Sequence, residues 1–79
     1  MSETHYLKIL PKYFADVRTG VKTFEIRKND RNYKVGDTLF LREYENGYFT
    51  GNIVEAVVTY ITDYAQKDNY VVMAIELND

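Results

Sequence analysis

The sequence contains no cysteine, so it can form neither a disulfide bond nor a thiolate metal site. His5 is the only histidine, and the acidic residues do not follow the D-x-D-x-D-G spacing of a calcium-binding loop. The P-loop and the glycine-rich dinucleotide fingerprint are missing, as is the G-x-S-x-G turn of a serine hydrolase. We therefore expect no bound metal and no cofactor.

Long apolar runs are missing as well. None approaches the roughly 20 residues that a membrane-spanning helix needs, and the N-terminal residues lack the basic-then-apolar pattern of a secretory signal. We therefore interpret the chain as a cytoplasmic protein without a membrane partner. Its 79 residues suit a single domain over residues 1–79, which we expect to be a monomer. Nothing in the sequence identifies a protein partner.

Positive charges are slightly outnumbered by negative charges, but they are concentrated in one stretch. The net charge is −2 at pH 7, which does not by itself favour a polyanionic partner. Six of the ten Lys and Arg residues nevertheless fall within residues 18–34, together with only two acids. Because a local patch matters more to an anionic ligand than the total charge, this stretch is the candidate for contact with a nucleic acid or nucleotide.

Alternating apolar and polar residues predict β-strands along most of the chain. The one proline, Pro11, suits the first position of a helix, and Phe14 and Val17 then lie on one helical face. A short helix is therefore expected over residues 11–19, ended by Gly20. The predicted strands cover residues 4–10, 23–27, 38–44, 48–50, 53–61 and 70–77.

The order of these segments predicts an α+β fold. Asn46 and Gly47 form the strongest short signal for a tight hairpin, and Gly51-Asn52 marks a break or a bulge. Residues 53–61 carry apolar side chains on both faces, as a central strand does. We expect five to six mostly antiparallel strands and one short N-terminal helix, arranged as a small, partly closed β-barrel, with an open α+β sheet as the alternative.

Residues 20–31, GVKTFEIRKNDR, combine most of these cations with a short predicted strand. Phe24 and Ile26 alternate with polar neighbours and are expected to anchor the strand in the core. Lys22 and Glu25 are three residues apart, so on a regular strand their side chains would point to opposite faces. They can converge only if Lys22 lies in the loop before the strand, a geometry that the preceding glycine permits.

A lysine beside a carboxylate can act as a nucleophile or a general base. Lys22 and Glu25 are therefore candidate catalytic residues, with Glu76 as a further carboxylate in reach of the same cleft. The plain alternatives are an ion pair on a strand surface and, for Glu76, simple exposure to solvent. Whether the chain is an enzyme stays open on these residues alone.

The candidates for binding the phosphates of a nucleic acid are Lys22, Arg27, Lys28 and Arg31. The alternative for Arg27 is a pair with Glu25 and nothing more, because the two side chains share one face of the predicted strand. Lys28 and Arg31 flank a polar loop whose backbone can approach a phosphate chain. Their alternative is an ordinary solvated surface.

Three residues outside this stretch are assigned to the walls of the same cleft: His5, Lys8 and Tyr44. His5 shares a face with Leu7 and Ile9, so its alternative is a partly buried ring that is hydrogen-bonded to a neighbour. Tyr44 is a candidate for stacking on a base, with packing against the protein as the alternative.

The motif G-x-K-x-x-E-x-R, formed here by Gly20, Lys22, Glu25 and Arg27, resembles the signature of the ASCH family of the PUA-like superfamily. More broadly, the segments THYLKILPKYF, TFEIRKNDRNYKVGDTL and LREYENGYFTG are similar to a small phage- and bacteria-associated family of unknown function, with the patterns H-x-L-K-I-x-P and F-E-I-R-K-N-D-R. The resemblance implies a small PUA-like β-barrel whose motif lines a cleft beside the helix. It also implies RNA binding.

Some small ASCH relatives are amidohydrolases that act on N4-acetylcytidine through the motif lysine, a threonine and a distant glutamate. By resemblance, Lys22 corresponds to the lysine and Glu76 lies near the glutamate, whereas Glu25 stands where the threonine is expected. The favoured hypothesis is an RNA- or nucleotide-binding module, and the alternative is an amidohydrolase acting on a modified nucleoside. A third interpretation, a phage protein that binds a host protein, is compatible with the acidic remainder of the chain.

Overall fold

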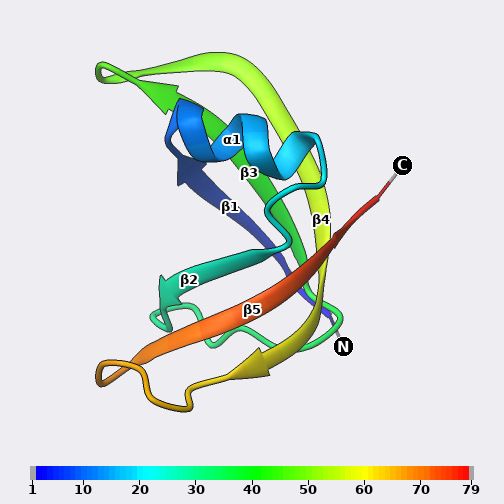
Figure 1. Ribbon diagram of the computed structural model, residues 1–79, viewed down its shortest axis with the longest axis vertical. Coiled ribbons are helices and arrows are strands. Elements are labelled where there is room, and N and C mark those ends of the chain that lie inside the picture. Colours follow the sequence, from blue (N-terminus) through cyan, green and yellow to red (C-terminus); the bar gives the residue numbers. More distant parts are fainter. Residues whose placement is uncertain (1, 79) are drawn as a thin grey trace.

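The computed structural model describes residues 2–78 (Figure 1). Five strands in this part of the chain form one sheet in the order β1-β3-β4-β5-β2, and one helix packs against it. The elements are β1 (Thr4–Ile9), α1 (Pro11–Arg18), β2 (Phe24–Lys28), β3 (Thr38–Glu45), β4 (Tyr48–Thr62) and β5 (Tyr70–Leu77). The expected α+β fold with one short N-terminal helix is confirmed.

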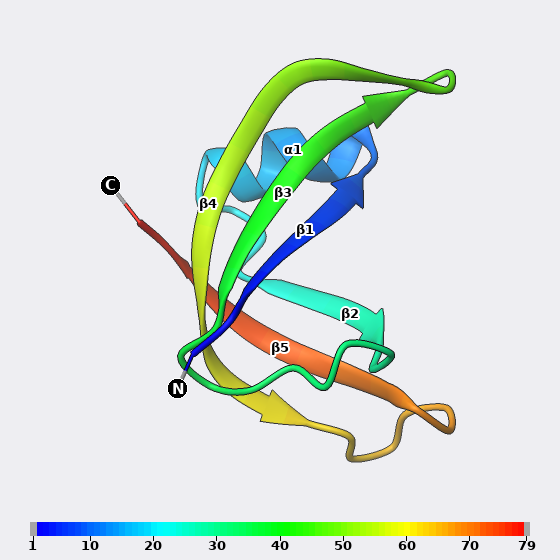
Figure 2. The same ribbon diagram turned by 180° about the vertical axis from the view of Figure 1, so that it is seen from behind.

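The sheet is mixed and curls into a half-barrel (Figures 1 and 2). β1 runs parallel to β3, and the other three pairings are antiparallel. The central strand, β4, pairs with β3 along its first part and with β5 along its last part. Register shifts in both pairings let β4 bend between the two halves of the sheet. Residues 48–50 and 53–61, predicted as separate segments, therefore belong to one strand, and Gly51 lies within it at a φ of 96°.

The hydrophobic core lies between the concave face of the sheet and α1. From α1, Phe14 and Val17 are only 3% and 1% exposed, as their helical spacing predicted. Pro11 occupies the first turn of the helix, and Gly20 follows its C-cap in a left-handed conformation with a φ of 81°. The strands contribute alternate residues to the same core: Leu7, Ile9, Leu39, Leu41, Ala56, Val58, Val71, Met73 and Ile75.

A cluster of polar hydrogen bonds centred on Asp37 joins the start of β1 to the turn before β3. The Asp37 carboxylate is fully buried and accepts hydrogen bonds from the backbone N–H groups of Glu3 and Lys34 and from His5 Nε2, which lies 2.9 Å away. Burial alone would raise the pKa of the Asp37 carboxyl, but these hydrogen bonds outweigh that effect and hold the pKa below its usual value. His5 is therefore the buried, hydrogen-bonded ring of the plainer interpretation.

The expected orientation of β2 is wrong. Phe24 and Ile26, predicted to anchor the strand in the core, are 42% and 51% exposed, whereas Glu25 between them is 3% exposed. Glu25 pairs in register with Met73, a fully buried residue of β5, and so faces the interior of the half-barrel. The strand is inverted because the Glu25 carboxylate finds two cationic partners there.

Within residues 2–78, no helix has the length and apolar character needed to cross a membrane.

Candidate functional site

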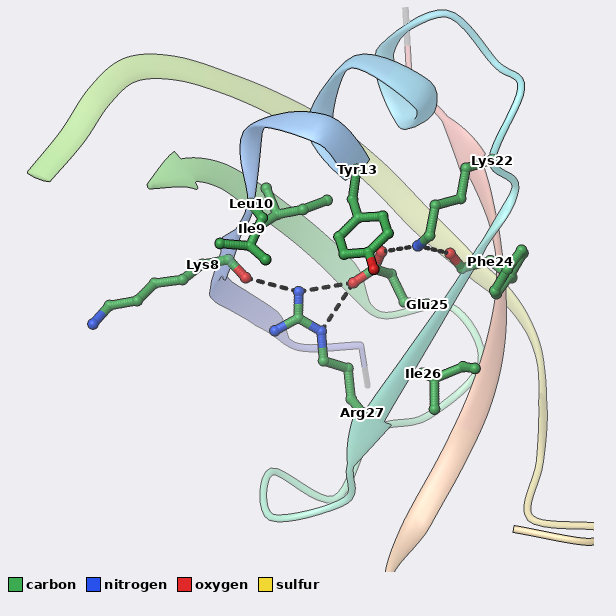
Figure 3. Close-up of a pocket in the computed structure, with 9 residues that line it drawn as sticks. All are labelled: Lys8, Ile9, Leu10, Tyr13, Lys22, Phe24, Glu25, Ile26 and Arg27. Atoms are coloured by element: carbon green, nitrogen blue, oxygen red, sulfur yellow. Dashed lines mark hydrogen bonds and ion pairs between the residues drawn. The ribbon is translucent and has the colours of Figure 1, made fainter. Parts of the chain in front are cut away.

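A pocket of about 520 Å³ opens on the side of the half-barrel where the sheet does not close. It lies between β2 on one side and the end of β1 with the start of α1 on the other (Figure 3). Its lining residues are Lys8, Ile9, Leu10, Tyr13, Lys22, Phe24, Glu25, Ile26 and Arg27. The volume falls within the range of small-molecule sites.

A buried carboxylate with two cationic partners lies in this pocket. The Glu25 side chain is 4% exposed; Lys22 Nζ lies 2.5 Å from its Oε2, and Arg27 Nε lies 2.9 Å from its Oε1. Because an unpaired charge is very costly to bury, the two cations are what allow Glu25 to face inward. The cluster carries two positive charges against one negative charge, so it retains a net positive charge.

Lys22 reaches Glu25 because it is not part of the strand. It lies in the loop between α1 and β2, where the backbone N–H groups of Val21 and Lys22 both donate to the carbonyl of Asp16. Its Nζ also donates to the carbonyl oxygen of Phe24 at 2.6 Å. The departure from strand geometry that their convergence requires is therefore present, and Lys22 meets Glu25.

Arg27 connects the two free edges of the sheet. β1 and β2 are the edge strands, and Arg27 Nη2 donates to the carbonyl oxygen of Lys8 on β1 at 2.8 Å. Arg31, just beyond β2, donates to the carbonyl oxygen of Tyr6 at 2.9 Å. These two side chains thus satisfy edge carbonyls that a neighbouring strand would otherwise occupy, and they hold the half-barrel together beside the pocket.

Aromatic and aliphatic side chains form the mouth of the pocket. Tyr13 and Phe24 are 41% and 42% exposed. Lys22 Nζ lies between them, 5.7 Å from the centroid of the Tyr13 ring and 4.7 Å from that of Phe24 (Figure 3). Leu10 and Ile26 are also exposed and extend the apolar rim. The site therefore offers flat apolar surfaces above a polar, cationic floor.

A second depression of about 350 Å³ adjoins the first and shares Lys8 and Arg27 with it. Its lining residues are Tyr6, Leu7, Lys8, Arg27, Arg31, Arg42 and Phe49. In the described part of the chain, four of these residues are cations and none is an acid. This depression is therefore the more strongly positive of the two.

Residues 4–75 match the family described as a domain of unknown function, DUF3850. The chain belongs to this family. It is also 46% identical over 74 residues to an uncharacterized 12.9 kDa protein in the GpA 3′ region of Escherichia phage P2, an alignment that covers 92% of this chain and 68% of the phage protein. The matched DUF3850 region contains every residue that lines the two depressions.

Within residues 2–78 of this DUF3850 fold, five of the predicted site residues line at least one of the two depressions and four line neither. Lys8, Lys22, Glu25 and Arg27 line the first pocket, and Arg31 lines the second depression. Among residues 2–78, four others line neither: His5 lies in the core, Lys28 and Glu76 are exposed on β2 and β5, and Tyr44 packs beside Lys8, with Nζ 4.4 Å from the ring centroid.

The sequence did not identify several further residues that line these depressions, among them Tyr13, Phe24, Ile26 and Arg42. Phe24 was expected in the core. Tyr13 lies on the exposed side of α1, and its aromatic side chain was the only signal that the sequence offered. Ile26 was misplaced together with Phe24, because the alternation favoured burial of the apolar face, whereas the ion pairs of Glu25 place the opposite face inside. Arg42 carried no signal at all, because its place beside Lys8 in the second depression depends on the pairing of β1 with β3.

The described residues also include one cluster with the composition of a cation site, Glu3, His5 and Asp37. Both carboxylate oxygens of Asp37 already accept hydrogen bonds from the protein. The hydrogen bonds that join β1 to the turn before β3 therefore account fully for this cluster.

Proposed function

We propose that this DUF3850 chain is an RNA- or nucleotide-binding module of the ASCH type, which holds a base in the pocket between β2 and α1. The observation that carries the proposal is the combination of exposed rings, Tyr13 and Phe24, with the buried cluster of Lys22, Glu25 and Arg27. A base has flat apolar faces and a polar edge. Stacking on aromatic rings and hydrogen bonding along the edge are the usual means by which proteins hold unpaired bases.

The cationic cluster keeps donors in reserve for such a ligand. Among residues 2–78, the hydrogen bonds of Arg27 use Nε and Nη2, which leaves Nη1 available. Lys22 has three ammonium protons, of which the contacts with Phe24 and Glu25 use two. Because Glu25 fixes both cations, these donors are held in place before a base carbonyl or a phosphate oxygen arrives.

Phosphate groups would lie toward the more positive end of the site. Lys8 and Arg27 form the boundary between the two depressions, and Arg31 lies just beyond it. Lys28 is exposed at the end of β2 and adds to the positive field. Binding should therefore weaken as salt rises, since phosphate contacts release counterions.

The test is a calorimetric titration with adenosine and uridine 5′-monophosphates at low salt. We expect Tyr13→Ala and Phe24→Ala each to weaken binding by about 1–3 kcal/mol, the usual worth of one base stacked on an aromatic ring. Tyr64→Ala is the matched control, because Tyr64 is 83% exposed in the loop between β4 and β5 and within residues 2–78 does not line the pocket. Absence of binding at millimolar nucleotide and low salt would remove the proposal, as would equal losses in all three variants.

The alternative is an amidohydrolase acting on a modified nucleoside such as N4-acetylcytidine. The observation in its favour is that Lys22 and Glu25 meet inside a pocket of nucleoside size. Glu76, the third candidate, is exposed and within the described chain does not line that pocket, so this mechanism would rely on Lys22 and Glu25 alone. Release of acetate from N4-acetylcytidine that is abolished by Lys22→Ala would favour the enzyme, whereas turnover that survives this substitution would exclude the mechanism.

A further inference from the structure

The outer face of β1 and β3 carries a row of aromatic and cationic side chains. The Tyr6 and Phe40 rings are stacked, with centroids 5.1 Å apart and an interplanar angle of 13°. Next to them, the Arg42 guanidinium lies 3.8 Å from the centroid of the Phe49 ring. Aromatic rings and cations thus lie side by side on a surface that the core does not use.

The sheet register makes this surface continuous. In the parallel pairing of β1 with β3, Tyr6 lies opposite Phe40 and Lys8 lies opposite Arg42. Cross-strand partners project from the same face of a sheet, so these four side chains form one block. At the hairpin end, Phe49 of β4 lies opposite Tyr44. The Tyr44 ring in turn lies 4.4 Å from Lys8 Nζ, which joins the hairpin to the block.

The charge of this surface indicates an anionic occupant. Its depression is lined by Lys8, Arg27, Arg31 and Arg42, and no acid lines it within residues 2–78. Two acids lie beside this surface: Glu43 accepts hydrogen bonds from the Thr50 hydroxyl and the Asn52 amide, and Glu55, which lies opposite Phe40, accepts one from the Asn78 amide. Four cations in a chain whose net charge is −2 form a patch that opposes the overall charge.

We propose that this outer surface is a second nucleotide-binding stretch for single-stranded RNA, continuous with the base pocket. The inference rests on the proposed function, because the strand is taken to continue from the pocket across the boundary formed by Lys8 and Arg27. Its phosphates contact Arg31 and Arg42, and an unpaired base stacks on Tyr6, which is 57% exposed. Rings interleaved with cations suit a single strand, because the bases of a duplex are already stacked on one another.

The site should therefore distinguish an oligonucleotide from a mononucleotide. We expect octauridylate to bind at least about 10-fold more tightly than uridine 5′-monophosphate at low salt, because additional phosphates and a second base are held. Arg42→Gln and Tyr6→Ala should each weaken octauridylate binding by about 5- to 10-fold and leave mononucleotide binding unchanged. Arg42→Gln should also reduce the slope of log K against log salt by about 0.7, the value for one contact to a single strand.

The control is Lys67→Gln, which removes one positive charge from the loop between β4 and β5. Lys67 lies outside both depressions within the described residues. This variant should bind octauridylate as the unaltered protein does. Thermal unfolding of each variant shows whether it is folded. If Tyr6→Ala does not fold, Arg42→Gln still provides the test, because the Arg42 side chain is only half-buried.

The outcomes separate this inference from the base pocket. If the protein binds the mononucleotide and Arg42→Gln leaves octauridylate binding unchanged, the proposal of a second stretch is overturned and the proposal of a base pocket stands. If octauridylate binding depends on Arg42 but no mononucleotide binds, the outer surface remains a binding site for the single strand and the proposal of a base pocket is overturned. Binding of octaglutamate as tightly as octauridylate at the same salt would also overturn the inference, because it would assign the surface to acidic protein segments.

Discussion

Replacing Glu25 with glutamine tests the reason for the inverted orientation of β2. The substitution keeps the shape of the side chain but removes the negative charge that Lys22 and Arg27 contact at 2.5 and 2.8 Å. The two cations then lie in the pocket without their counterion. We expect the variant to be less stable than the unaltered protein at neutral pH.

The magnitude follows from burial. Removing one partner of a buried ion pair typically costs about 3–5 kcal/mol. The Lys22 and Arg27 side chains are 16% and 24% exposed, so water can solvate them in part, and the expected loss falls to about 2–3 kcal/mol. A chain of 79 residues has a total stability of about 4–12 kcal/mol, so the loss is a large share of it.

Urea denaturation at neutral pH measures this loss directly. The midpoint should fall for Glu25→Gln while the slope stays constant, because the surface exposed on unfolding is unchanged. Glu76→Gln is the matched control: its side chain is exposed, and its effect should stay within about 0.5 kcal/mol. In a double-mutant cycle, Arg27→Gln should cost less in the Glu25→Gln background than alone. Equal losses at positions 25 and 76, or strict additivity with Arg27→Gln, would refute the reasoning.

Two further predictions concern the scaffold. The pKa of Asp37 is lowered in the folded protein, so its ionised form contributes stability above the unfolded value near 4, and this contribution is lost as the pH falls through the folded value. In the Asp37→Asn variant, the urea midpoint should therefore fall less steeply below about pH 4 than it does in the unaltered protein. Midpoints of the two proteins that fall in parallel with pH would contradict the assignment. Gly47 has a φ of 86° with open space around it, so Gly47→Ala should cost about 1 kcal/mol through the backbone alone; an unchanged melting temperature would contradict this.

Local patterns were sufficient to predict most of the elements. Pro11 and Gly20 bracket α1, and Asn46-Gly47, at φ values of 51° and 86°, forms the turn between β3 and β4. These signals are reliable because each depends on the conformational limits of one or two residues. The parallel pairing of β1 with β3 was not specified in the same way, because it joins segments far apart in the chain.

The candidate site was predictable in its charges but not in its walls. The spacing of Lys22 and Glu25, with a glycine before them, correctly defined the condition for their convergence. The burial of Glu25 could not be foreseen, because it depends on contacts that only the assembled half-barrel supplies, including the one from Arg27 to the Lys8 carbonyl. Phe24 consequently moved from the predicted core to the mouth of the pocket.

The most direct test of base binding is the map of backbone amide shifts during a titration with uridine 5′-monophosphate at low salt. Bound nucleotide should move the amide signals of Tyr13, Lys22, Phe24 and Arg27, whose side chains line the pocket. The signal of Tyr64 in the loop between β4 and β5 should stay in place. Shifts that cluster on that loop instead, or no shifts at millimolar nucleotide, would contradict the account.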